Sequence, residues 1–353
     1  MSDQGKPPRP WRMFLPLAGL LLLGLVWSGI WFAAARGAER MIDALLQREA
    51  ARGHMVSCDD RALSGYPFRI ILDCRNPRLL IDRRGERLTY QAQHLKAVAQ
   101  VWRFNHIIAE VTGPVAVAPA DRPDAPLFIG QWTLAQASAV LQSDAARALD
   151  ISIDGLAIAL PRKEPASADL QNPLLTAAHV EAHALRREEV ADRLDYDLAL
   201  SGNSIVFGAR DNVAPQALIP VRQMEMRATV RGLPRGISDD PRRNLQLWQA
   251  NQGTLTIDRL WVDADAGAAL ANGNLLLEPS GKPSGALTLA IANADALVQN
   301  GDAEFLRLIM SGLKFIGRKR ELDGRQAIEV DLTLRDGAVA LGPAIVGQIP
   351  PLF

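Results

Sequence analysis

The sequence predicts a mainly β protein: a long curved antiparallel sheet (a groove, a curled sheet or a sandwich) with a few helices, following an N-terminal transmembrane helix. Apolar and polar residues alternate with a period of two in roughly a dozen segments between Cys58 and Gly342, which is typical of half-buried strands. Stretches with helical periodicity are few, and one uncharged run near the start is long enough to cross a bilayer. These three observations define the fold class.

The uncharged run extends from Met13 to Ala35 and contains 23 residues. As a helix it would be about 35 Å long, and the hydrocarbon core of a bilayer is about 30 Å thick. Trp11, Trp27 and Trp31 lie near its ends, where indole rings prefer the membrane interface. The run is therefore predicted to be a transmembrane signal anchor.

Positive charge precedes the anchor, since Lys6, Arg9 and Arg12 outnumber the single acid Asp3. The positive-inside rule then places residues 1–12 in the cytoplasm and exports residues 36–353 as one β-rich domain. We expect a single-pass protein of the inner membrane with its body in the periplasm. Ala33–Ala35 leaves open a cleaved signal peptide, although the apolar region is longer than such peptides usually have.

The two cysteines of the chain, Cys58 and Cys74, both follow the anchor and would meet an oxidising compartment. The runs Met55–Asp60 and Phe68–Cys74 are predicted to pair as a hairpin, with a structural disulfide joining its ends. Two buried free thiols are the alternative. A redox-active pair is disfavoured because the close C-x-x-C spacing is absent.

Three stretches are assigned by their periodicity. Ala38–Gly53 has an apolar stripe and is predicted to be an amphipathic helix that leaves the membrane. Asp302–Arg318 carries a broad apolar stripe and is predicted to be a helix packed on the sheet. Trp132–Ala148 fits either a helix or a strand, and a strand is favoured. Ser238–Pro241 is interpreted as one of the turns.

Strict alternation marks Leu194–Leu200, Met224–Val230 and Ile328–Leu334 as strands with one apolar face. Two longer strands slip by one residue, at Gly155 and at Asp258-Arg259. Because a slip would turn the apolar residues to the other face, a β-bulge is expected at each place. Long bulged strands suit a twisted, curved sheet.

The predicted strands outnumber the helices that could cover their apolar faces. Leaving those faces bare would cost about 2 kcal/mol for each large aliphatic side chain. Two arrangements solve this problem. The sheet can close on itself, or it can form a groove or tunnel that shelters an acyl chain.

Catalytic motifs are absent from the sequence: G-x-S-x-G, H-E-x-x-H, G-x-G-x-x-G and Walker A runs are not found. On a strand, His179, Glu181 and His183 would share one face and could bind zinc. Residues two apart on a strand are separated by about 6.6 Å, which fits poorly with zinc–ligand distances near 2.1 Å. A solvated polar face is favoured, so neither a metal nor another cofactor is predicted.

Two passages resemble known families. Ala269–Val298 (ALANGNLLLEPSGKPSGALTLAIANADALV) resembles the repeating strand–turn–strand unit of AsmA-like envelope proteins. The whole chain resembles the DUF2125 family of alphaproteobacterial envelope proteins, through its anchor, the LSGYPFRI run (Leu63–Ile70) before a cysteine, and the ending Leu341–Leu352. The DUF2125 resemblance implies location and architecture only. The AsmA-like resemblance implies a periplasmic β-groove associated with lipid transport or outer-membrane assembly.

The function expected from these observations is non-enzymatic: a membrane-anchored periplasmic protein that binds or transfers lipid in a β-groove. One alternative is a scaffold with a closed core that binds another envelope protein. A metal-dependent hydrolase using His179, Glu181 and His183 is a third hypothesis. Equal numbers of basic and acidic residues, 39 each, argue against nucleic acid as a partner.

Overall fold

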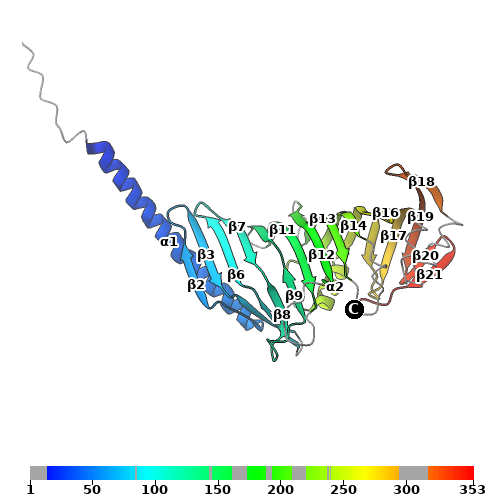
Figure 1. The fold of residues 1–353 in the computed structure, drawn as a ribbon, viewed down its shortest axis with the longest axis horizontal. Coiled ribbons are helices and arrows are strands. Elements are labelled where there is room, and N and C mark those ends of the chain that lie inside the picture. The colour runs from blue at the N-terminus through cyan, green and yellow to red at the C-terminus, as the bar shows by residue number, and fades with distance from the viewer. Residues whose placement is uncertain are drawn as a thin grey trace, which may run out of the picture.

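A long helix leads into a single curled sheet in the computed structural model, which describes residues 14–83, 86–142, 145–160, 173–187, 193–208, 220–236, 238, 240–293 and 317–353 (Figure 1). Within these residues, 21 strands form one open antiparallel sheet and two helices are present. The mainly β prediction is confirmed, and of the three arrangements expected the open curled sheet is the one found.

The helices are α1 (Leu15–Ala51) and α2 (Pro241–Ala250). The strands are β1 (His54–Ser57), β2 (Asp60–Ser64), β3 (Arg69–Arg75), β4 (Arg78–Arg83), β5 (Glu86–Gln91), β6 (His94–Gln100), β7 (Arg103–Thr112), β8 (Val115–Pro119), β9 (Phe128–Gln131), β10 (Leu134–Leu141), β11 (Ala146–Ala159), β12 (Leu175–Arg186), β13 (Leu194–Phe207), β14 (Val221–Leu233), β15 (Thr254–Ala264), β16 (Gly267–Leu277), β17 (Pro283–Ala292), β18 (Arg318–Leu322), β19 (Arg325–Arg335), β20 (Ala338–Leu341) and β21 (Ala344–Gln348).

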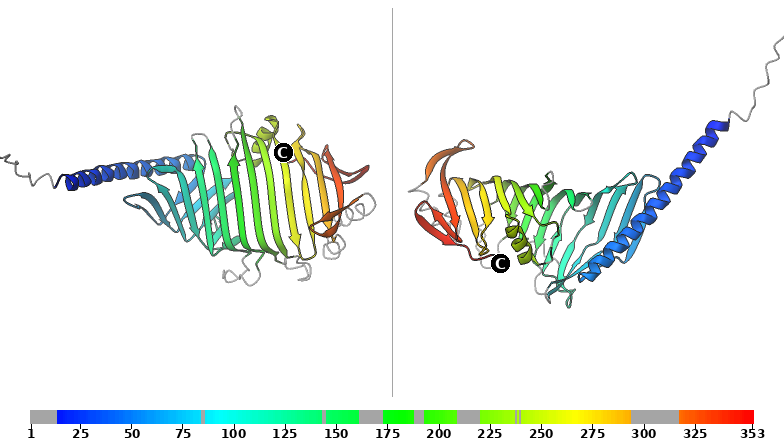
Figure 2. Two further views of the ribbon diagram at one scale, coloured as in Figure 1. Left: turned by 90° about the horizontal axis from the view of Figure 1, so that it is seen from above. Right: turned by 180° about the vertical axis from the view of Figure 1, so that it is seen from behind.

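Helix α1 is continuous over 37 residues, about 55 Å, so the predicted anchor and the predicted amphipathic helix Ala38–Gly53 are two parts of one element. It is long and apolar enough to cross a membrane. The helix ends where Gly53 takes a φ of +87° and donates its backbone N–H to the carbonyl of Ala50. Figure 2 shows its second half lying against the N-terminal strands, with the first half projecting away from the sheet.

The first ten strands are halves of five longer ones, bent along a line that we call the crease: residues 58–59, 76–77, 92–93, 113–114 and 132–133. The β1–β4 pairing sets His54 opposite Ile81, and the β2–β3 pairing continues the same register with Asp60 opposite Arg75. Backbone hydrogen bonds bridge the crease, for example from Asp59 N–H to the carbonyl of Arg75. The N-terminal part of the sheet is therefore a simple meander with a fold across it.

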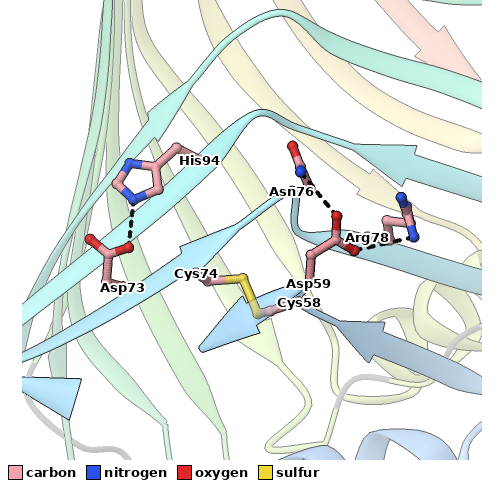
Figure 3. The surroundings of a disulfide bond; sticks show 7 residues. All are labelled: Cys58, Asp59, Asp73, Cys74, Asn76, Arg78 and His94. Atoms are coloured by element: carbon pink, nitrogen blue, oxygen red, sulfur yellow. Dashed lines mark hydrogen bonds and ion pairs between the residues drawn. A yellow bond between two sulfur atoms is a disulfide. The ribbon is translucent and has the colours of Figure 1, made fainter. Parts of the chain in front are cut away.

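A disulfide joins Cys58 and Cys74 at this crease, with their Cα atoms 5.5 Å apart (Figure 3). Beside it, Asp59 accepts a hydrogen bond of 2.9 Å from the Asn76 side chain and lies 3.4 Å from a guanidinium nitrogen of Arg78. These contacts hold the first bent strand onto the second.

The predicted hairpin between Met55–Asp60 and Phe68–Cys74 is wrong. β1 pairs with β4, and the hairpin is formed by β2 and β3. A tight turn is the reason: Arg69 N–H donates to the carbonyl of Gly65, which sets Ser64 opposite Ile71. Cys58 then lies just before β2 rather than within a strand paired to β3.

The long strands from β11 to β17 continue the meander side by side (Figure 2). The predicted bulge at Asp258-Arg259 is confirmed, because the registers of β15 with both β14 and β16 shift there. The bulge predicted at Gly155 is wrong. Both neighbouring registers run through it unbroken, and the residue takes a φ of +62° instead. Glycine adopts this conformation without strain, and a side chain here would also collide with the Thr133 hydroxyl.

One ion pair demonstrates the curl at the C-terminal end. A guanidinium nitrogen of Arg325, at the start of β19, lies 2.9 Å from a carboxylate oxygen of Asp263 in β15. Strands β16 and β17 lie between them, so a flat sheet would separate the two strands by about 14 Å. The twist and curl of the sheet bring β15 and β19 close enough for the two side chains to form the ion pair.

The remaining sequence assignments have mixed outcomes. Trp132–Ala148 forms β10 and the start of β11, as favoured. Most of the predicted helix Asp302–Arg318 lies outside the described residues, and its last residue, Arg318, begins strand β18. The turn expected at Ser238–Pro241 leads directly into α2. Its first turn is capped by Asp240, which accepts a hydrogen bond from Arg242 N–H.

Candidate functional site: the apolar face of the sheet

Cross-strand pairing places apolar residues in two continuous rows across the sheet, which together we call the apolar face. In each row, every residue lies directly opposite the next one on the neighbouring strand. The first row is Leu72, Ala97, Ala109, Ala137, Ile151, Ala182, Leu200, Met226, Leu260, Ala271, Leu289 and Val330. The second is Ile70, Ala99, Ile107, Ala139, Leu149, Ala184, Leu198, Ala228, Ile257, Gly273, Leu287, Leu332 and Leu341.

The first row crosses twelve strands without one polar side chain. At about 4.8 Å between strands, it is roughly 53 Å long. Strands with one apolar side would produce an apolar face even if their apolar residues were staggered from strand to strand. Here the register of each strand pair sets apolar residues directly opposite one another. The two rows therefore form a continuous apolar track that runs perpendicular to the strands.

The track is covered unevenly. At the C-terminal end, β20 and β21 fold over it, and Val330, Leu332 and Leu341 are buried in one cluster. In the middle, Leu149 and Ile151 of β11 remain 42% and 46% exposed. Leu149 and Ile151 therefore leave an exposed apolar patch in the middle of the track.

Helix α2 lies beside the second row at β11 to β14, and together with the sheet it borders a half-open cavity of about 890 Å³. The sheet contributes Leu149, Leu198 and Val230, and the helix contributes Leu245 and Trp248. Small-molecule sites typically have volumes of about 300–1,000 Å³ and are mostly apolar. This cavity has the size and chemistry of such a site. The sequence prediction of a groove contained no indication of it.

Three hydrogen bonds fix α2 over the cavity. The Trp248 indole donates to the carbonyl of Arg231 at 2.7 Å, and Asn251 donates to the carbonyl of Gly232 at 3.2 Å. The backbone N–H of Gly253 donates to the carbonyl of Trp248 at 2.8 Å. A side chain at position 253 would collide with the Trp248 ring, so glycine is required where the chain passes beneath it.

The opposite face carries the residues that the sequence analysis considered as zinc ligands, and here they form a hydrogen-bonded ladder. His179 lies 2.6 Å from Asp154 and 3.0 Å from Glu181. His183 lies 2.8 Å from Asp150 and 3.6 Å from Glu181. Each imidazole therefore lies between two carboxylates on strands β11 and β12.

These contacts determine the direction of each pKa shift. The hydrogen bond to Asp154, followed by the one to Glu181, raises the pKa of His179. The hydrogen bond to Asp150 raises the pKa of His183, and the hydrogen bond from His179 lowers the pKa of Glu181. Among the described residues, no group of three or more histidine, cysteine or acidic side chains is arranged to hold a metal ion. The ladder is a network of hydrogen bonds between ionisable side chains that links β11 to β12.

The sequence analysis identified the three ladder residues but not their partners Asp150 and Asp154, which lie on the preceding strand. It also missed α2. The signal for that helix was present, since Asp240-Pro241 is a favourable N-cap and N1 pair followed by Leu245 and Trp248 at helical spacing.

A family model described as "Uncharacterized protein conserved in bacteria (DUF2125)" matches residues 31–350. No curated protein and no solved structure matches the chain. The AsmA-like resemblance thus stays a prediction. The family match extends from the second half of the predicted anchor through β21 and covers nearly all of the described sheet. This chain belongs to the DUF2125 family, as the anchor, the LSGYPFRI run and the C-terminal segment predict.

Proposed function

We propose that this protein is held in the inner membrane by α1, with its sheet in the periplasm, and that the apolar face binds or transfers the acyl chains of lipids. The observation that supports this proposal is the track of the apolar face. It is continuous over twelve strands, open in the middle, and linked to a helix long enough to span a bilayer.

The orientation rests on charge. Lys6, Arg9 and Arg12 precede the apolar part of α1, and such residues are retained on the cytoplasmic side. The disulfide between Cys58 and Cys74 suits the oxidising periplasm. Both arguments support a location of the sheet outside the cytoplasm.

The ligand class rests on surface chemistry. Burial of each methylene contributes about 0.8 kcal/mol, so burying ten carbons of an acyl chain would release about 8 kcal/mol before the costs of binding. Most side chains that line the cavity beneath α2 are aliphatic, such as Leu198 and Val230, and the polar groups at its rim come from Tyr196, Arg235, Asn244 and Trp248. A flexible hydrocarbon chain fits such a surface better than a polar metabolite does.

Lipid extraction and mass spectrometry of the full-length protein, purified in a mild detergent, tests this proposal. Ala184 lines the cavity and Ala199 lies on the opposite face of the adjacent strand, so Ala184→Phe and Ala199→Phe are a matched pair. Ala184→Phe should reduce co-purified lipid at least several-fold, and Ala199→Phe should leave it unchanged.

If the unaltered protein carries no lipid, or if both variants lose it equally, the lipid proposal is wrong. A stoichiometric protein partner recovered by crosslinking, with no lipid, would instead support the scaffold hypothesis.

A further inference from the structure

Aromatic side chains from three parts of the chain meet where α1 joins the sheet. Trp27, Trp31 and Phe32 belong to α1, Tyr66 and Phe68 to the β2–β3 turn, and Trp102 to the β6–β7 turn. The ring centres of Trp27 and Phe68 are 6.0 Å apart, those of Trp31 and Tyr66 are 5.5 Å apart, and those of Phe68 and Trp102 are 6.3 Å apart. We call this set the anchor cluster.

The position of the cluster along α1 sets its depth in a bilayer. A hydrocarbon core of about 30 Å corresponds to about 20 helical residues, which is close to the length of the uncharged stretch of α1 from Leu15 to Ala35. The first charged residue after this stretch is Arg36. Trp27 lies eight residues before Ala35, about 12 Å deeper along the helix axis. The β2–β3 turn, which contacts Trp27, must then lie within the hydrocarbon core, deeper than the point at which α1 leaves it.

The β2–β3 turn has the composition that this depth requires. Gly65, Tyr66, Pro67 and Phe68 carry no charge. Phe68 is 55% exposed. Trp102 of the neighbouring β6–β7 turn and Phe104 at the start of β7 are 60% and 65% exposed. Large aromatic side chains exposed together beside an anchor are typical of a membrane interface.

Hydrogen bonding of the turn backbone gives an independent argument. A lipid-exposed loop is tolerated only if its polar backbone groups are satisfied within the protein. The carbonyl of Pro67 accepts from the Trp27 indole at 2.9 Å, and the carbonyl of Arg69 accepts from the Trp31 indole at 2.8 Å. The carbonyls of Gly65 and Phe68 accept from the backbone N–H groups of Arg69 and Val101.

The one hydroxyl group of the cluster, on Tyr66, also has a hydrogen-bond partner within the protein. Tyr66 Oη lies 2.8 Å from Ser28 Oγ, which in turn lies 2.7 Å from the carbonyl of Gly24 within α1. Arg69 and Arg103 flank the aromatic residues and are exposed. Their long side chains can reach lipid phosphates while the rings lie deeper.

We propose that the turns Gly65–Phe68 and Val101–Phe104 insert into the periplasmic leaflet beside α1 and form a second contact with the lipid bilayer. The track of the apolar face begins at Ile70 and Leu72, directly after the first of these turns. The membrane contact rests on the proposed anchoring by α1 and does not depend on lipid binding in the cavity.

Site-specific photocrosslinking tests this inference. Each variant carries p-benzoylphenylalanine in place of one residue of the full-length chain, in vesicles of phosphatidylethanolamine and phosphatidylglycerol. Phe68 and Phe104 are the test positions. Phe128 of β9, 43% exposed and on the other side of the crease from the anchor cluster, is the matched control. Leu20 of α1 reports on anchoring itself.

We expect lipid adducts at positions 20, 68 and 104, and an at least tenfold lower yield at 128. Adducts at position 20 alone would overturn the inference and leave the anchoring intact. Lack of adducts at position 20 would overturn both. Crosslinks from 68 and 104 to a second copy of the chain would show that the exposed aromatic rings form a protein interface instead.

Discussion

Replacement of Trp248 by alanine is expected to release α2 from the sheet and open the cavity beneath it. The indole makes a 2.7 Å hydrogen bond to the carbonyl of Arg231 and lines the cavity with Leu245. A lost hydrogen bond costs about 1 kcal/mol. Full removal of a buried Trp side chain costs about 3–5 kcal/mol, and this half-buried ring should cost about half of that. The variant should therefore lose about 3 kcal/mol of local stability.

Two measurements check this value. In a domain of this size 1 kcal/mol corresponds to about 2 °C in Tm, so thermal unfolding of Trp248→Ala should occur about 6 °C lower. Hydrogen exchange should accelerate at the backbone N–H of Asn251 and Gly253, which bond to residues of α2. Trp248→Phe keeps a ring but loses the donor, and should cost only about 1 kcal/mol. If Trp248→Ala unfolds and exchanges like the unaltered protein, α2 is not held as described.

Further predictions concern the disulfide, the ion pair across the curl, and the polar ladder. Replacing Cys58 and Cys74 by serine should destabilise the N-terminal strands by about 3 kcal/mol, because the disulfide no longer closes a loop of 16 residues. Limited proteolysis should then cut the chain near the crease, and an unchanged cleavage pattern would contradict this prediction. Asp263→Ala should cost about 1–2 kcal/mol in thermal unfolding, because it leaves both Arg222 and the partly buried Arg325 without this partner. Asp265→Ala removes a contact of Arg222 alone, at a more exposed carboxylate, and should cost less; equal losses would argue against the bridge. The pKa values of His179 and His183 are raised, so the stability that these two residues contribute is fully present below pH 6.5 and is lost as the pH rises through their raised pKa values. The pKa of Glu181 is lowered, so the stability that this residue contributes is present above pH 4.5 and is lost as the pH falls through its lowered pKa. Glu181→Gln should therefore lower the Tm more at pH 5.5 than at pH 8.5, and an equal effect at both pH values would refute the pairing.

Local patterns were sufficient to predict the strands in which apolar and polar residues alternate strictly, although only about a dozen of the 21 described strands were expected. Alternation in Leu194–Leu200 and Met224–Val230 reflects burial on one face, which depends only on the period of a strand. The bulge at Asp258-Arg259 was predicted for the same reason. At Gly155 the same kind of slip has another solution, since a positive φ reorients the chain without an extra residue.

Features that depend on distant partners were not predicted. The crease arises because five long strands are each interrupted at positions that lie side by side in the sheet. The sequence of one strand does not show where the interruptions of its neighbours fall. The partner of β1 is β4 rather than β3, because the tight turn after Ser64 sets the register. A helix as short as α2 gives a weak periodic signal, and its stability comes from packing on the sheet.

The sequence predicted that the candidate site would be an apolar surface, but it did not predict how the residues of that surface are arranged. A surplus of one-sided strands indicated an apolar surface in need of cover. Whether Ile151, Ala182 and Leu200 would meet in one row depends on three registers that the sequence does not state. The anchor cluster was anticipated only through the interfacial preference of Trp27 and Trp31.

The central claim is that the apolar face, and not the polar one, carries acyl chains. It is tested most directly with a phospholipid that bears a photoreactive group at the end of one acyl chain, incubated with the full-length protein in vesicles, followed by mapping of the labelled residues. The account predicts labels on Leu149, Ile151, Leu198 and Leu200, whose side chains lie along the track. Labels confined to α1, or spread equally onto Ser152, Ala199 and Ser201 of the opposite face, would contradict it.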